Sequence, residues 1–249
     1  TDTASSPGER VFDYVVVGSG AGGGPVAANL ALAGFTVGLI EAGGEDAGPS
    51  YDIPVFHAAA SEDPAMRWDY FVQHYRNPER AARDPKWVRE RGGVYYPRAG
   101  TLGGCTAHHA LVTLYPHNSD WDRLAAALGD PSYSADAMRR YFERLERCEY
   151  GDRDDDARHG HEGWLPTRMV DPTLALRDLQ LVKLVWAALS EAKDLHISPG
   201  PRSLLSGRLP DPNDWRNVTA NRDGVFGVPL SMHRGRRAVR GRGRKPPRP

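Results

Sequence analysis

Glycines near the start of the chain are spaced so that their backbone could approach a phosphate group. Gly18, Gly20 and Gly23 form the pattern G-x-G-x-x-G. The first glycine permits a tight turn, the second allows close approach to a pyrophosphate, and the third lets a helix pack closely on a sheet. Free N–H groups at a helix start, with the positive end of its dipole, stabilise an anion. The loop residues that we predict to bind are Gly18, Gly20, Ala21, Gly22 and Gly23.

The elements on both sides of this loop would position it. Tyr14–Val17 is a short β-branched run, typical of a strand buried on both faces. An apolar helix follows, with Gly34 suited to its C-terminal end. Phe35–Ile40 reads as the second strand, and Glu41 ends it where an acidic side chain can accept hydrogen bonds from a ribose. This order favours the opening of a dinucleotide-binding domain over the alternative of a plain glycine-rich turn.

A second glycine-rich stretch leads into a pair of histidines. Gly100, Gly103 and Gly104 are followed by small residues, so this backbone could lie flat against a ring system. His108 and His109 come next. From the residues alone they could be metal ligands, a catalytic base, a flavin attachment point, or plain loop or core histidines. Neighbouring histidines point in different directions, and a metal would need further ligands at definite spacing.

Composition narrows the class of protein. The chain has 249 residues, with 32 Lys and Arg against 32 Asp and Glu, so overall charge implies no acidic partner. Two cysteines, Cys105 and Cys148, do not make a disulfide scaffold. No apolar run approaches the roughly 20 residues of a membrane span, and the polar residues 1–10 lack a signal-peptide core. We therefore expect a cytoplasmic protein without a membrane span.

Together the two glycine-rich stretches resemble the glucose–methanol–choline (GMC) oxidoreductases, which are FAD-dependent enzymes. The resemblance lies in DYVVVGSGAGGG…EAGG and in YYPRAGTLGGCTAHHALVTLYP, and the second stretch is similar to the choline oxidase and dehydrogenase type. It implies an α/β fold, in which a Rossmann-like FAD-binding domain of the GMC type is followed by the beginning of an α+β substrate-binding domain, truncated. The residues that this resemblance adds to Glu41 and the first loop as FAD-binding residues are Ala42, Gly100, Gly103, Gly104, Cys105, His108, His109 and Ala110.

The histidine pair departs from the usual family pattern. His109 stands where most members have Asn. His108 stands where some members carry a histidine joined covalently to the flavin. The resemblance leaves two states open at His108, a covalent bond to FAD and a neutral histidine packed against a non-covalent flavin.

The later part of the chain predicts mostly structural elements. A helix is expected over Ser134–Cys148, capped by Ser134, with Tyr141 in the apolar stripe that faces the core. His159 and His161 are expected in a structural turn before a strand, and the run 152–156 as a solvated acidic loop, so we predict no metal site.

These patterns divide the chain into four expected segments. They are a disordered leader at 1–10, the FAD-binding domain over 11–150, the start of the substrate domain over 151–237, and a basic low-complexity tail over 238–249. The substrate domain would include an amphipathic helix from Asp171 to about Asp194. The tail indicates a shifted reading frame or premature end, or, as the alternative, a nucleic-acid contact through clustered arginines.

The predicted function is FAD-dependent oxidation of the CH–OH group of a small-molecule alcohol, such as choline, glucose or a similar alcohol. The family's catalytic His has no counterpart here, so the catalytic residues are unknown. We expect the chain alone to be catalytically incomplete, with apolar edges and faces of its sheet exposed. Two alternatives stay open: a non-catalytic module that binds nucleotides or nucleic acid, and an NAD-dependent dehydrogenase, which Glu41 and the glycines alone would permit. The second glycine-rich stretch favours FAD.

Overall fold

The structure is a computed structural model that describes residues 10–44, 48–151, 153, 157–170, 178–194, 209–220, 224–233 and 236–237. The chain divides into two compact units, Thr1–Ala110 with Gly235–Pro249, and Leu111–Arg234. The boundary predicted near residue 150 separates an FAD-binding domain from a substrate domain, which is not the division between these two units, and it stays a prediction. Within the described residues, no helix is both long and apolar enough to cross a membrane.

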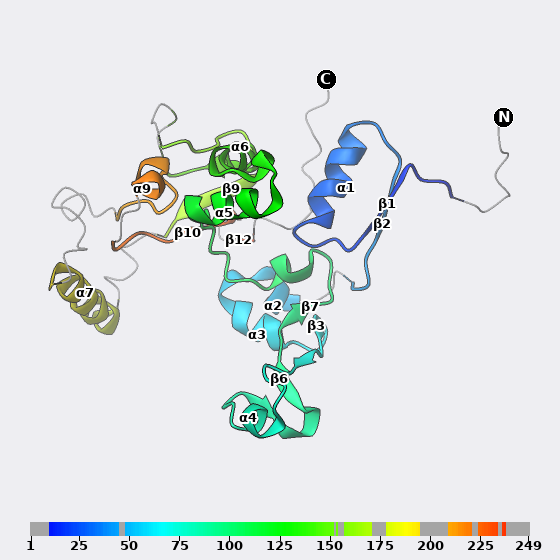
Figure 1. Ribbon diagram of the computed structural model, residues 1–249, viewed down its shortest axis with the longest axis horizontal. Helices are drawn as coiled ribbons and strands as arrows, with labels where there is room; N and C mark the ends of the chain where they lie inside the picture. Colours follow the sequence, from blue (N-terminus) through cyan, green and yellow to red (C-terminus); the bar gives the residue numbers. More distant parts are fainter. Residues whose placement is uncertain are drawn as a thin grey trace. The chain divides into compact units, whose positions relative to one another are not determined.

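The first unit opens with a parallel β–α–β motif (Figure 1). Strands β1 (Tyr14–Val17) and β2 (Val37–Ile40) pair in parallel along their full length, and helix α1 (Gly23–Leu32) connects them and packs against both. Gly34 follows α1 with φ +95°, the left-handed conformation common just after a helix end. The predicted strand, helix and strand are confirmed.

The predicted burial of β1 on both faces is wrong. Val15 and Val17 of β1 are 57% and 79% exposed, and Ile40 of β2 is 57% exposed. Within the described residues, β1 and β2 form a sheet of two strands. One packed helix cannot cover both faces of a sheet, so much of the apolar surface faces solvent.

The rest of the first unit is built from short elements. Helices α2 (Gly48–Asp52) and α3 (His57–Glu62) follow β2 in the chain, with the 3₁₀ helix η1 (Pro54–Phe56) between them. A small core forms here from Tyr51, Ala60, Met66 and Ala107. The elements that follow are β3 (Arg67–Trp68), β4 (Phe71–Val72), α4 (Pro78–Ala82), β5 (Trp87–Val88), η2 (Arg89–Arg91), β6 (Gly93–Tyr95), β7 (Arg98–Ala99) and η3 (Gly104–Ala107). Strand β3 pairs with β7, and β6 lies between β4 and β5, all antiparallel.

The charged stretch Asn77–Arg91 is not the plain loop that its composition suggests. Asn77 caps α4 by accepting a hydrogen bond from the N–H of Arg80 at 2.9 Å, and Pro78 stands in the first turn. Strand β5 pairs with β6. The capping signal N-P was present in the sequence and outweighs the charge pattern.

The second unit combines helices with a three-stranded sheet. Its elements are α5 (Asn118–Leu128), η4 (Pro131–Tyr133), α6 (Ala135–Leu145), β8 (Glu146–Cys148), β9 (Leu165–Met169), α7 (Leu179–Asp194), α9 (Trp215–Thr219), β10 (Pro229–Leu230) and β11 (Met232–His233). Strand β9 lies in the middle of the sheet, parallel to β8 and antiparallel to β10. The short strand β12 (Arg236–Arg237) belongs to the other unit. The expected helix start at Asp171, most of the acidic run 152–156 and the tail 238–249 lie outside the described residues.

Helix α6 confirms its predicted start and corrects its end. Ser134 caps it by accepting from the N–H of Ala137 at 3.4 Å. The helix stops at Leu145 because the next three residues pair with β9 as a strand. Tyr141, expected in the core-facing stripe, is 60% exposed. The fully buried residue of this helix is Arg139.

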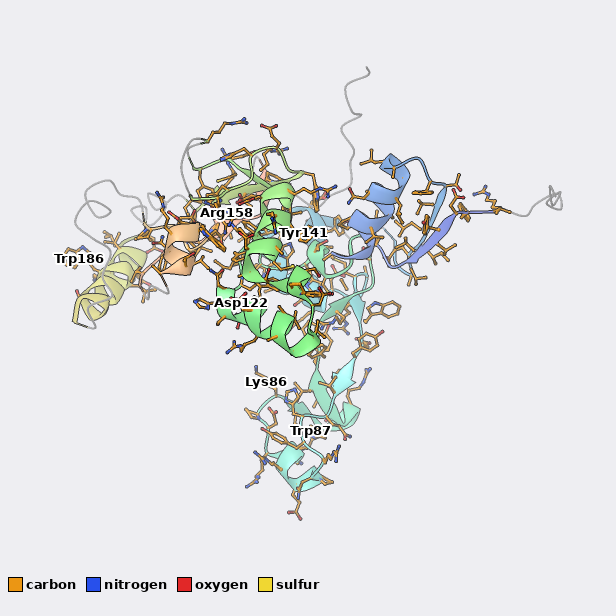
Figure 2. The ribbon with its side chains drawn as sticks, turned by 45° about the horizontal axis from the view of Figure 1, so that its top comes forward. Lys86, Trp87, Asp122, Tyr141, Arg158 and Trp186 are labelled. Carbon is orange, nitrogen blue, oxygen red and sulfur yellow. The ribbon has the colours of Figure 1, made fainter. Side chains whose placement is uncertain are left out.

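Cationic side chains join α6 to its surroundings. The Arg139 guanidinium donates to the carbonyl oxygen of Ala157 at 2.8 Å and lies 5.1 Å from the Tyr115 ring centre. Arg158, which Figure 2 shows between α6 and α9, is bonded to Glu143 of α6 at 2.6 Å and lies 4.5 Å over the ring of Trp215 in α9. These contacts fix α9 against α6 within this unit.

Candidate functional site

The first glycine loop makes a turn that side chains would block. Gly18 has φ +88°, and its N–H donates to the carbonyl oxygen of Ile40 at 2.7 Å, which ties the loop to the end of β2. A Cβ at Gly23 would overlap the carbonyl oxygen of Gly18. The first and third glycines of the pattern are therefore needed for the backbone path itself.

The start of α1 is suited to an anion. The helix has ten residues, its N-cap Gly22 offers no side-chain cap, and its first turn holds no acidic residue. The first N–H groups of a helix have no partner within the helix, but in α1 the N–H of Gly24 already donates to the carbonyl oxygen of Gly20 at 3.0 Å and Pro25 has no N–H, so the N–H groups of Gly22 and Gly23 are the candidates for binding an anion. A Cβ added at Gly22 would meet nothing within 4 Å, so space adjoins these N–H groups. The loop from Gly18 to Gly23, with Ala21 exposed in its middle, fits a diphosphate.

Glu41 lies directly after β2 and is bound to this loop. Its Oε2 accepts from the N–H of Ser19 at 2.7 Å and from the Ser19 hydroxyl at 2.5 Å, while Oε1 accepts from the N–H of Gly43 at 3.1 Å. Burial alone would raise the pKa of Glu41, but the bonds from Ser19, Gly43 and Ala42 outweigh it and lower that pKa. Glu41 is thus held as an acceptor beside the loop.

The second glycine-rich stretch lies against the first. The N–H of Gly103 donates to the Ser19 hydroxyl oxygen at 2.8 Å. Gly104 has φ +55°, and a Cβ there would come within 3.0 Å of the Gly20 Cα. Gly43 also needs to be glycine, because a Cβ there would overlap the backbone of Gly100. The structure therefore brings together both predicted glycine sets and Glu41.

The other residues predicted to bind FAD come directly after Gly104 in the chain. Cys105 is half-buried in η3, and the N–H groups of His108 and His109 donate to its carbonyl oxygen at 3.3 and 3.1 Å. Both histidines are half-buried and the Nε2 atom of each is buried, whereas Ala110 is exposed. Their role in binding stays a prediction.

Three residues of the site were missed from the sequence. Ser19 bridges Glu41 and Gly103, the Tyr51 hydroxyl donates to the carbonyl oxygen of Leu102 at 2.9 Å, and a Cβ at Gly100 would lie 2.8 Å from the Trp68 ring. A serine inside a glycine loop is itself a signal, because its short hydroxyl readily bonds nearby backbone. Tyr51 and Trp68 carry no such signal.

Comparisons with known proteins agree with this arrangement. No family model matches the chain. Choline oxidase of Arthrobacter globiformis is 29% identical over 173 residues, which cover 69% of this chain and 29% of that enzyme. A GMC-type oxidoreductase of Mycobacterium bovis is 32% identical over 135 residues, covering 54% of this chain and 23% of that protein. The chain thus spans less than a third of the length of either curated relative.

A solved structure has the same fold. Pyridoxine 4-oxidase of Mesorbium loti superposes with a TM-score of 0.63 at 26% identity, over 92% of this chain and 40% of that one. The predicted α/β fold class is confirmed, and the match covers both compact units.

Proposed function

We propose that the chain is a GMC oxidoreductase over the part that it shares with these relatives, and that this part binds FAD for the oxidation of an alcohol, CH–OH to C=O. The relatives are named as oxidases and oxidoreductases, which supports the reaction class.

One observation carries the proposal: the Ser19 hydroxyl links the two glycine-rich stretches beside Glu41. It donates to Glu41 and accepts from Gly103, so loop, acid and second stretch form one connected surface within the first unit. A plain glycine-rich turn has no need of an ionised acid and a second glycine stretch at the same place.

Each part of this surface would hold a different part of FAD. The N–H groups at the start of α1 would bind the diphosphate, and Glu41 would accept from the adenosine ribose. The stretch from Gly103 to Ala110 would lie beside the flavin ring, with His108 as the candidate for covalent attachment. When bound, the flavin supplies the hydride acceptor for alcohol oxidation.

Acid precipitation of the 249-residue chain after expression tests cofactor loading. Flavin absorbance in the precipitate would support covalent FAD, and H108A should move that flavin to the supernatant. Flavin in the supernatant of the unaltered chain would support non-covalent FAD. If neither fraction holds flavin, binding of added FAD decides the proposal.

Competition separates this site from a general nucleotide site. Added FAD should bind with quenched fluorescence, and ADP should displace it more effectively than FMN, because Glu41 and the α1 amides would contact the ADP half. E41A should weaken FAD binding about tenfold, as expected for a lost charge-assisted hydrogen bond. E90Q is the matched control, since Glu90 is exposed and lies in η2. Equal FAD affinity in E41A and E90Q would contradict the assignment, and tighter binding of NAD⁺ than of FAD would favour the dehydrogenase alternative.

A further inference from the structure

A cluster of metal-ligating side chains lies in the second unit, apart from the residues assigned to FAD. Glu146 and Cys148 stand two positions apart on β8, so their side chains leave the same face of the strand. His159 precedes β9 and joins them. One ligand atom from each of the three lies within 4.8 Å of the other two.

The cluster is buried and its members are held in place. The side chains of Glu146 and His159 are 1% and 2% exposed, and Cys148 is 7% exposed. Glu146 Oε1 accepts from the Thr167 hydroxyl at 2.6 Å, and Oε2 accepts from the N–H of Gly160 at 3.2 Å. The carboxylate is therefore fixed by two donors besides its contact with His159.

His159 lies between two carboxylates, and its contact with Asp211 is of the kind that metal-bound histidines make on the side away from the metal. Its Nε2 lies 2.7 Å from Oδ2 of Asp211, and its Nδ1 lies 2.8 Å from Oε2 of Glu146. Histidines that bind a metal through one ring nitrogen usually donate from the other to a carboxylate. Asp211 is itself held, because its Oδ1 accepts from the N–H of Asn213 at 2.8 Å.

In contrast to the prediction from sequence of a purely structural turn at His159, we propose that Glu146 Oε2, Cys148 Sγ and His159 Nδ1 form a zinc site, with Asp211 orienting the imidazole. A thiolate, an imidazole and a carboxylate together suit zinc, whereas magnesium and calcium take oxygen ligands. Three protein ligands leave the fourth position of a tetrahedron to water or another small ligand.

Zinc would take the place of the hydrogen bond between His159 Nδ1 and Glu146 Oε2. On binding, the proton shared by His159 Nδ1 and Glu146 Oε2 and the proton of the Cys148 thiol would be released to solvent. The distance between Nδ1 and Oε2 would then increase from 2.8 Å to about 3.3 Å, as two ligands of a tetrahedral zinc require. The bonds from Thr167, Gly160 and Asp211 stay in place. Binding would clamp β8 to the loop before β9, a role that goes beyond the proposed oxidoreductase function.

Cobalt provides a spectroscopic test on the whole 249-residue chain. After removal of metal with a chelator, Co²⁺ should bind at one equivalent with intense tetrahedral bands and a thiolate-to-cobalt band in the near ultraviolet, and Zn²⁺ should displace it. C148A should lose the thiolate band. C105A is the matched control, because Cys105 is the other free cysteine and lies in the other unit, and it should keep that band.

Zinc affinity and the urea midpoint of unfolding test the site independently of the cobalt spectrum. D211N should keep the thiolate band and bind Zn²⁺ about 10- to 100-fold more weakly. Zn²⁺ should raise the urea midpoint of the unaltered chain and of C105A, but not of C148S, whose folding is checked by circular dichroism. An unaltered chain without a thiolate band, a folded C148S chain that retains it, or an unchanged urea midpoint with Zn²⁺ would overturn the site.

Discussion

Ser19 and Gly103 lie 84 positions apart in the chain and share a hydrogen bond of 2.8 Å, from the Gly103 N–H to the Ser19 hydroxyl oxygen. The same hydroxyl donates to Glu41. One short side chain thus connects the loop after β1, the acid after β2 and the second glycine-rich stretch.

Removing this hydroxyl should weaken both folding and FAD binding. In S19A the N–H of Gly103 loses its acceptor, so we expect the free energy of unfolding to fall by about 1–3 kcal/mol and FAD affinity to fall about tenfold. Urea unfolding and fluorescence titration measure the two effects. S61A is the control, because the Ser61 hydroxyl makes only an exposed local bond to Ala58. If S19A and S61A bind FAD equally well, Ser19 does not support the site.

The glycines of the first loop should separate into structural and binding positions. In G23A the new methyl group overlaps the carbonyl oxygen of Gly18, so the free energy of unfolding should fall by about 1–3 kcal/mol or more. In G20A the nearest atom is the Gly104 Cα at 3.9 Å, an ordinary contact, so folding should be nearly unaffected. The methyl group would nevertheless occupy the approach of a diphosphate, and FAD affinity should fall at least about tenfold. A G20A chain with normal FAD affinity would place the diphosphate elsewhere.

Glu41 should make stability depend on acid pH. Its pKa is lowered in the folded chain, so the unfolded chain takes up its proton first as the pH falls below the ordinary value near 4.5. The stability that Glu41 contributes is present above that pH and is lost as the pH falls through the lowered pKa. Urea unfolding between pH 3 and 7 should therefore show a shallower loss in E41Q than in E90Q. Parallel curves for the two variants would show that Glu41 makes no such contribution.

Replacing Arg139 of α6 should lower the free energy of unfolding far more than replacing its neighbour Arg140. Arg139 is fully buried, and burial lowers its pKa while Glu146 and Glu143 oppose that effect. R139A would leave a cavity and remove both Arg139 donors from the carbonyl oxygen of Arg158, whereas the Ala157 carbonyl oxygen would keep its bond from the N–H of Trp215, so we expect a loss of about 3 kcal/mol in the free energy of unfolding. R140A should change it by no more than about 0.5 kcal/mol, because that side chain is 68% exposed. Equal effects in urea unfolding would mean that the burial of Arg139 contributes little.

Local patterns predicted the backbone around the first glycine loop. The turn at Gly18, the helix after it and the position of Glu41 all follow from residues close together in the chain. The contact of Ser19 with Gly103 could not be predicted, since it depends on how two distant segments pack. The same holds for Gly43, whose need for glycine comes from the approach of Gly100.

Periodicity misjudged α6 for a physical reason. It ranks Tyr141 as apolar and Arg139 as polar, yet Arg139 is buried and Tyr141 is exposed. Carbonyl oxygens of a later loop accept from Nε and Nη2 of Arg139, and the rings of Tyr115 and Trp215 lie against its guanidinium, whereas Nη1 is buried without a hydrogen-bond partner among the described residues. Those partners are distant in sequence, so no window around α6 contains them. The end of α6 is likewise set by β9, which the next three residues join.

The open apolar faces of β1 and β2 affect how solution data on this chain are interpreted. Val15, Val17 and Ile40 offer binding places for dyes such as anilinonaphthalene sulfonate even when every hydrogen bond of the motif is intact. Strong dye fluorescence is usually taken as the mark of a molten globule. For this chain that fluorescence is compatible with native order, and loss of near-ultraviolet circular dichroism is the observation that distinguishes a molten state.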